Sequence, residues 1–141
     1  MKRTATAVWT GGIKDGKGVL STQSGILKDT QYGFSSRFEN GAGTNPEELI
    51  AAAHAGCFAM ALSAQLGEAG MTAQSLTVNA AVTIEKAGAG FSITAVHLEL
   101  AARIPGASQQ AFEQAAKAAK EGCPVSKLLN AAITLEARLE A

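Results

Sequence analysis

The sequence lacks an excess of charge of either sign. Its 141 residues include twelve basic and twelve acidic side chains, so the formal net charge at pH 7 is zero. Proteins that bind nucleic acid neutralise phosphates with a surplus of Lys and Arg, and anionic membranes attract the same surplus. We therefore expect neither nucleic acid nor a membrane among the partners of this protein.

Targeting and nucleotide-binding motifs are also absent. The first ten residues begin with Lys and Arg but have no apolar stretch behind them, so they do not form a signal peptide, and we predict a cytoplasmic protein. The segment 11–18, Gly-Gly-Ile-Lys-Asp-Gly-Lys-Gly, is similar to a phosphate loop in composition only. It lacks the spacing of a P-loop and lies between strand-like segments, so it predicts a turn.

Cysteine and histidine are scarce. The chain has Cys57, Cys123, His54 and His97, at spacings that fit no zinc motif, and we predict no metal site. A structural disulfide is disfavoured in a reducing cytosol. Two interpretations remain for the cysteines: unrelated core thiols, or a transient catalytic disulfide.

What is present begins with short strands joined by Gly-rich turns. β-Branched and aromatic residues at 4–10, 19–22 and 32–38 are typical of strands, and three in succession predict a β-meander. On the last of these strands, the alternation of faces places Arg37 opposite the aromatic side chains.

A long apolar helix follows. Asn-Pro-Glu-Glu at 45–48 combines an N-cap side chain, proline at the first helical position and glutamate at the third, and the helix can continue to about Glu68, with Gly70 as its end. Residues 49–62 are almost entirely apolar. A membrane span needs about 20 such residues. We therefore predict a buried core helix.

The rest of the chain alternates strands and helices. The patterns predict a hairpin with a β-bulge near residues 94–95, and two helices followed by a last strand. The predicted ranges are strands 76–85, 91–100 and 132–140, and helices 108–121 and 124–129. Together the elements predict an α+β fold in one domain covering residues 1–141.

The two cysteines have different local surroundings. Cys123 precedes a Pro-started helix, where backbone N–H groups favour a thiolate, whereas Cys57 lies in the apolar helix and would be inert without a nearby charge. His54 lies one turn before Cys57, within reach of the thiol. A Cys–His pair is therefore possible, but we predict that His54 is a core histidine bonded to a backbone carbonyl.

Helix geometry limits which charges can activate Cys57. Glu47 and Glu48 precede it by ten and nine residues, which is about 15 Å along a helix axis at 1.5 Å per residue. They cannot touch the cysteine of their own helix. A glutamate in the thiol site must therefore come from another subunit, with two copies of the helix packed antiparallel.

Two separated motifs carry a resemblance to a known family. Residues 43–62, which contain His-Ala-Gly-Cys-Phe, are followed 66 residues after their cysteine by Gly-Cys-Pro-Val-Ser at 122–126. With Tyr-Gly-Phe, Arg-Phe-Glu and a final Ile-Thr-Leu-Glu in the same order, the whole chain closely resembles the osmotically inducible protein C (OsmC) family. It resembles the OsmC branch more than the organic hydroperoxide resistance (Ohr) branch.

The resemblance implies a fold and an activity. It implies an intertwined homodimer in which antiparallel sheets wrap around two long central helices. It also implies a thiol-dependent peroxidase of oxidative and osmotic stress defence, which prefers organic hydroperoxides over hydrogen peroxide. The implied enzyme has no cofactor, and an external dithiol such as a dihydrolipoyl group reduces it.

The resemblance also implies a role for four residues. Cys57 matches the peroxidatic cysteine and Cys123 the resolving cysteine. Arg37 matches the arginine that stabilises the thiolate and Glu47 the glutamate that orients it, both supplied by the partner subunit. Three other arginines, Arg3, Arg103 and Arg138, remain available for this role.

Apolar side chains would line the site for an organic tail, with Phe38, Phe58 and Met60 as candidates that could equally be plain core. The alternative function is a non-catalytic dimeric stress protein that binds a small apolar ligand, in which the cysteines only pack. The fate of the two thiols on exposure to hydroperoxide separates these hypotheses.

Overall fold

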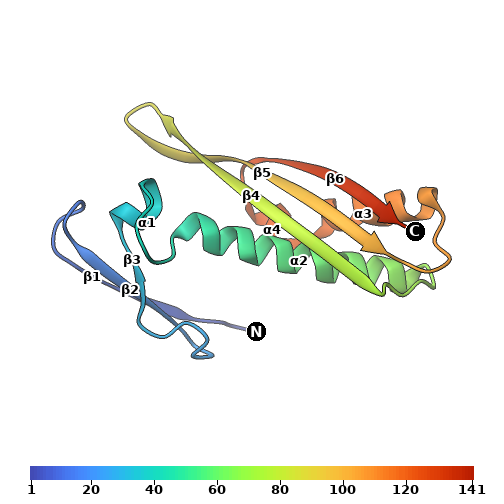
Figure 1. Ribbon diagram of the computed structural model, residues 1–141, viewed down its shortest axis with the longest axis horizontal. Coiled ribbons are helices and arrows are strands. Elements are labelled where there is room, and N and C mark those ends of the chain that lie inside the picture. The colour runs from blue at the N-terminus through green and yellow to red at the C-terminus, as the bar shows by residue number, and fades with distance from the viewer. The chain divides into compact units, whose positions relative to one another are not determined.

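The computed structural model describes all residues from 1 to 141 and groups them into two compact units, Met1–Leu49 and Ile50–Ala141. Each unit is described by itself, with the element labels of Figure 1. The elements combine helices with two three-stranded sheets, so the predicted α+β class is confirmed. One domain over the whole chain stays a prediction.

The first unit is a β-meander. β1 (Ala5–Thr10), β2 (Lys17–Thr22) and β3 (Thr30–Tyr32) form an antiparallel sheet in that order. A Cβ at Gly18 would collide with the rings of Trp9 and Tyr32, so glycine allows these rings to pack over the strand, with centroids 5.7 Å apart. The predicted meander is therefore confirmed.

The end of the meander differs from the prediction. Arg37 lies on a short helix, α1 (Phe34–Phe38), and not on a strand. The Ser36 hydroxyl accepts a hydrogen bond from the Gly33 N–H at 2.9 Å and donates one to the Thr44 carbonyl at 2.8 Å. These contacts close a helical turn, and the alternation of aromatic residues did not reveal it because the bonds depend on a side chain and on a residue eight positions away.

The second unit contains a sheet with β5 in the middle. β4 (Ser75–Ala87) pairs antiparallel with β5 (Gly90–Arg103), and the register shifts between Thr83 and Ile84, which leaves Thr94 unpaired. The predicted bulge is confirmed. β6 (Ala132–Glu140) has the predicted limits, and the apolar side chains of β6 lie on one face.

One strand pairing contradicts the expected antiparallel sheets. β6 pairs with β5 in parallel. The connection between these strands contains α3 (Gln109–Gly122) and α4 (Pro124–Leu128). A parallel pair needs such a helical crossover, because the chain must return to the end of the sheet from which it started.

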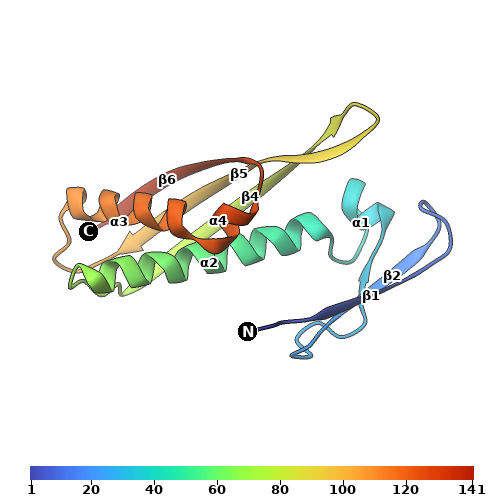
Figure 2. The ribbon, with the colours of Figure 1, turned by 180° about the vertical axis from the view of Figure 1, so that it is seen from behind.

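The core of the second unit lies between its helices and one face of the sheet. Figure 2 shows α3, α4 and the second-unit part of α2 (Pro46–Glu68) on the same side of the three strands. α2 contributes a stripe of buried side chains at every fourth position, and β5 and α3 contribute the facing ones. The largest buried side chains are Phe58, Phe112, Leu62, Leu66, Leu98, His54 and Val96.

The ends of α2 lie where the sequence predicts them. The Asn45 side chain accepts a hydrogen bond from the Glu48 N–H at 2.8 Å. After Glu68, Gly70 adopts a φ of 74°, a left-handed conformation that commonly ends helices.

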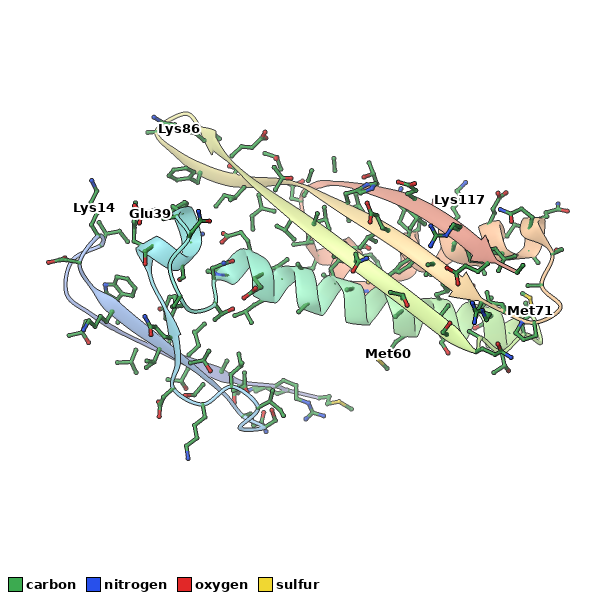
Figure 3. The ribbon with its side chains drawn as sticks, viewed as in Figure 1. Lys14, Glu39, Met60, Met71, Lys86 and Lys117 are labelled. Atoms are coloured by element: carbon green, nitrogen blue, oxygen red, sulfur yellow. The ribbon has the colours of Figure 1, made fainter.

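α2 is only partly covered within the chain. Its 23 residues are long and apolar enough to cross a membrane, a test that the core helices of soluble proteins also pass, and 22% of its most apolar window is buried. The expectation that it is too short for a span is wrong. Met60 is 77% exposed. Its side chain points away from the sheet, as Figure 3 shows. One face of the helix is core as predicted, and side chains on the opposite face are exposed.

Candidate active site

The two cysteines meet in the second unit. Cys57 lies on α2 and Cys123 at the junction of α3 and α4, and their sulfur atoms are 2.8 Å apart. Both are free thiols; Cys57 is half-buried, whereas Cys123 is 0% exposed. Because a disulfide bond is about 2.05 Å long, the sulfurs are in contact but not bonded. The structure therefore brings together two residues that are 66 positions apart in the sequence.

One contact fixes Cys123 at the end of α3, and another links the start of α4 to α2. The Cys123 N–H donates to the Ala119 carbonyl at 2.9 Å, which extends α3 up to the cysteine. On the other side, Pro124 starts α4, and Ser126 Oγ lies 2.8 Å from His54 Nε2 on α2. His54 is buried, as predicted, but its partner is this hydroxyl and not a carbonyl.

The surroundings shift the pKa values of the two thiols in opposite directions. Burial raises the pKa of Cys57, and the contact with Cys123 raises it further. Burial also acts to raise the pKa of Cys123, but contacts with Cys57, with the hydroxyl and N–H of Ser126 and with the Val125 N–H outweigh it, so the pKa is lowered. No positively charged side chain contributes to either shift. Within this unit, the thiolate therefore forms first at Cys123.

The first unit contains the predicted arginine and glutamate as an ion pair. Arg37 Nη2 lies 2.7 Å from Glu47 Oε1, and Arg37 Nε donates to both carboxylate oxygens at 3.1 and 3.2 Å. Glu47 is 7% exposed, so its charge needs this partner, because an unpaired buried carboxylate is costly. The fork of the guanidinium fixes the orientation of both groups.

Local hydrogen bonds bring this pair together. The Asn45 side-chain amide donates to the Ser36 carbonyl at 2.9 Å while the oxygen of the same amide caps α2. One asparagine thus ties the end of α1 to the start of α2, which sets Arg37 beside Glu47. Glu48 points elsewhere and accepts from the Thr44 hydroxyl at 2.6 Å.

An aromatic cavity of about 300 Å³ lies next to Arg37 in the first unit. Its walls include Trp9, Tyr32, Phe34 and Phe38, and the Arg37 guanidinium lies 5.1 Å from the centroid of the Phe38 ring. The cavity combines an apolar wall with a single cation. Of the predicted lining residues, Phe38 lies here; Phe58 belongs to the core of the second unit.

The other arginines have surface roles. Arg103 and Arg138 both pair with Glu140 at the exposed edge of the second sheet, at 3.4 and 3.1 Å. Arg3 contacts the Lys2 carbonyl and the sulfur of Met1 near the start of the chain. None of these three lies beside a buried carboxylate, which distinguishes Arg37 from them.

Ser126 is the residue of this site that sequence reasoning missed. A signal was present, because Ser126 stands three residues after Cys123 and both therefore lie in the first turn of a Pro-started helix. The link to His54 could not be inferred, since it joins residues 72 positions apart.

One further cluster could hold a metal ion. His97, Glu99 and Glu136 lie on the solvent side of the second sheet, with His97 Nε2 3.9 and 3.8 Å from the two carboxylates. His97 Nδ1 is 2.6 Å from the Thr134 hydroxyl. Both glutamates are exposed and His97 is half-buried, and exposed acidic groups are common without an ion. The cluster contains neither cysteine.

The fold and the pair of sulfurs define a class of protein. It is a thiol protein with two cysteines, in which a half-buried sulfur touches a buried one. A family model described as OsmC-like protein matches residues 39–138. The chain therefore belongs to the OsmC family.

Relatives and solved structures agree with this assignment. The chain is 52% identical over 134 residues to Peroxiredoxin OsmC of Escherichia coli K12, an alignment that covers 95% of this chain and 94% of that protein. A structure of an OsmC-like protein from Vibrio cholerae superposes with a TM-score of 0.79 at 18% identity, covering 98% and 99% of the two chains. The structure of the organic hydroperoxide resistance protein OhrB of Bacillus subtilis superposes with a TM-score of 0.68 at 25% identity, covering 97% of this chain and 98% of that one.

Proposed function

We propose that this protein is a thiol-dependent peroxidase that reduces organic hydroperoxides to alcohols in oxidative and osmotic stress defence. The contact of 2.8 Å between the sulfurs of Cys57 and Cys123 carries the proposal, because a sulfenic acid on one sulfur would form beside the thiol that captures it. The name peroxiredoxin of relatives that are 52% identical supports the same activity.

The proposed cycle begins at Cys57. Its thiolate attacks the terminal oxygen of the hydroperoxide, the O–O bond breaks, and the alkoxide takes a proton to become the alcohol. The Cys123 thiolate then attacks the sulfur of the Cys57 sulfenic acid, and hydroxide leaves as water once it is protonated. The resulting disulfide takes an electron pair and two protons from an external dithiol, which is itself oxidised to a disulfide.

The first step needs a cation that the second unit does not supply. Burial raises the pKa of Cys57, so a positive charge must favour its thiolate and the departing alkoxide. Arg37, held by Glu47, is the cation we assign to this task. Because α2 is one continuous helix, its ten residues from Glu47 to Cys57 rise about 15 Å, so we assign the pair to the partner subunit.

Exposed apolar surface supports a homodimer with shared sites. The uncovered face of α2 includes Met60, and in the first unit Val8 and Ile13 are more than half exposed. Removal of such exposed apolar side chains from water is favourable, which supports association with another protein surface. A second copy of the chain would cover both surfaces and deliver Arg37 to each Cys57.

The proposal also names a substrate, a reductant and a location. The aromatic cavity beside Arg37 suits the organic tail of a hydroperoxide, with the guanidinium at its reacting end. The reductant is an external dithiol, for which a dihydrolipoyl group is our candidate. The cycle needs no prosthetic group and no metal, and a cytoplasmic location stays a prediction.

Mixed dimers test the shared site. Cys57→Ser and Arg37→Met chains should each be inactive with cumene hydroperoxide. In a 1:1 mixture half of the dimers are mixed, and each has one intact site if Cys57 works with the arginine of the partner subunit. The mixture should therefore recover about a quarter of the wild-type activity, whereas sites within one chain would leave it inactive.

The matched control places both substitutions on one chain. Mixed with an equal amount of wild type, this double variant should leave only wild-type homodimers active, which is about a quarter of full activity. If each chain contained its own complete site, about half would remain. The two mixtures therefore fail in different ways if the shared site is wrong.

Treatment with one equivalent of organic hydroperoxide separates the enzyme from a non-catalytic protein that binds an apolar ligand. We expect rapid loss of both thiols and an intrachain bond between Cys57 and Cys123, detected by mass spectrometry of the peptides. If both thiols stay free, the ligand-binding function is correct and the peroxidase proposal fails.

A further inference from the structure

A second polar contact lies beside the cysteine pair. His54 Nε2 is 2.8 Å from Ser126 Oγ, which links α2 to α4. Ser126 stands three residues after Cys123, the N-cap of α4, so both residues lie in the first turn of that helix. The Ser126 hydroxyl accordingly favours the charged form of Cys123. The peroxidase cycle above assigns no task to His54 or Ser126.

The burial of His54 sets the direction of these hydrogen bonds. His54 is 0% exposed, and burial lowers its pKa, so the ring is neutral and carries one N–H. Its Nδ1 is buried and has no hydrogen-bond partner. A buried N–H without an acceptor is rare, which places the proton on Nε2. Nε2–H then donates to Ser126 Oγ, and the hydroxyl hydrogen of Ser126 is free to point at the sulfur of Cys123.

The two sulfurs also differ in access. Cys123 is completely buried, whereas Cys57 is half-buried and is the sulfur that must meet a hydroperoxide. An external thiol of similar size would therefore reach Cys57 and not Cys123. In thiol–disulfide exchange, attack on one sulfur expels the other, and a better stabilised thiolate leaves faster.

We infer that Ser126 and His54 are positioning residues for Cys123, whose thiolate they stabilise by a chain of hydrogen bonds, so that Cys123 is the sulfur released when a dithiol attacks Cys57 of the disulfide. The inference deepens the proposed function and rests on it for the disulfide. A thiolate of the dithiol bonds to Cys57 Sγ, the bond between Cys57 and Cys123 breaks, and the electron pair leaves on Cys123. The second thiol of the reductant then attacks the first sulfur of the reductant, which is bonded to Cys57. This step releases Cys57 as a thiolate and oxidises the reductant to a disulfide.

Titration of Cys123 in a Cys57→Ser protein tests the hydrogen-bond chain without the peroxidase reaction. In that background Ser126→Ala should raise the pKa of Cys123 by about one unit, since a hydrogen bond to a charged group is lost. Thiolate absorbance against pH measures the shift. Ser126→Thr keeps the hydroxyl and is the matched control. Its Cys123 should have the same pKa as in the Cys57→Ser protein.

His54 variants provide the second arm. His54→Gln retains an N–H that can reach Ser126, and it should raise the pKa of Cys123 less than His54→Leu, which removes the donor. Far-UV circular dichroism verifies that each variant is folded. A Cys123 pKa that is unchanged in both Ser126→Ala and His54→Leu would overturn the inference.

The site of attack is tested on the disulfide itself, formed with diamide so that no hydroperoxide is needed. Brief reaction with 2-mercaptoethanol and an acid quench should trap the mixed disulfide on Cys57, located by peptide mass spectrometry. Reduction by dihydrolipoamide should be slower in Ser126→Ala by about threefold or more. A mixed disulfide on Cys123 overturns the inference, whereas a disulfide that diamide forms but hydroperoxide does not would count against the proposed function alone.

Discussion

Under the proposed function, the two units of this chain supply complementary halves of a redox site, a cation half and a thiol half. The first unit has a cation, Arg37, fixed by a buried carboxylate, and it has no thiol. The second unit has two thiols in contact, and no positive charge contributes to the pKa of either. Under that proposal each half alone is chemically incomplete, because a thiol without a nearby cation stays mostly protonated at neutral pH and a cation without a thiol has nothing to activate.

The difference also concerns stability. The second unit has a continuous core in which Phe58, Leu62 and Phe112 are fully buried. The first unit leaves much of its apolar surface exposed, and its buried polar groups, Ser36, Thr44 and Glu47, mainly organise the ion pair. The thiols lie on the unit with the continuous core, and the cation lies on the unit that leaves much of its apolar surface exposed.

The largest effect is expected from the thiol half. Cys57→Ser should lower the rate of cumene hydroperoxide reduction on the order of 10³-fold or more, because a hydroxyl at neutral pH is a far weaker nucleophile than a thiolate. Cys123→Ser is the control: it should still react once with hydroperoxide and then stop as a sulfenic acid, which dimedone labels. Wild-type turnover in Cys57→Ser would refute the assignment of the peroxidatic cysteine.

The cation half comes next. Arg37→Met should lower kcat/KM by about 10²-fold and shift the rise of activity to higher pH, because Cys57 then loses the charge that favours its thiolate. A pH profile of kcat/KM measures both changes. Arg138→Gln removes an exposed guanidinium and should change neither.

Loss of Arg37 also leaves Glu47 buried without its partner. Adding Glu47→Gln to Arg37→Met should restore stability to thermal unfolding but not activity, which separates the two effects. If Arg138→Gln impairs activity and Arg37→Met does not, the site uses a different arginine and the comparison between the units is wrong.

The smallest effect concerns the pH dependence of folding in the thiol half. Burial lowers the pKa of His54 below its ordinary 6.5, so at pH values below 6.5 the unfolded chain binds a proton that the folded chain does not. His54 therefore does not reduce the free energy of unfolding above about pH 6.5, and that free energy falls as the pH drops from there towards the lowered pKa, by at most about 1.4 kcal/mol per pH unit.

Urea unfolding at pH 7.5 and 5.5 measures this loss. His54→Gln should reduce the difference in unfolding free energy between the two pH values, because glutamine does not titrate. An equal pH dependence in wild type and His54→Gln would mean that His54 is not the residue responsible.

Much of the fold could be predicted because its signals are local. Asn45 and Gly70 set the ends of α2, and the change in the apolar pattern along β5 revealed the bulge at Thr94. In the candidate site, the local settings alone pointed to the lower pKa of Cys123, as the structure has it. A cap or a period of two involves only neighbouring residues, so the sequence is sufficient to detect it.

Three features were not predictable for a shared reason. Arg37 is helical because Ser36 bonds to Thr44, β6 is parallel because two helices carry the chain across the sheet, and the partner of His54 is Ser126. Each depends on residues that are distant in the sequence. Patterns read within a short window contain no information on such pairings.

The sequence by itself determined the α+β class, the long apolar helix and the two cysteines in unlike surroundings. Only the tertiary structure decided that these cysteines touch, that their surroundings raise the pKa of Cys57 and lower that of Cys123, and that Arg37 is bound to Glu47. The physical reason is that nucleophilicity depends on burial and on neighbouring charges, which are properties of the folded environment and not of the residue type.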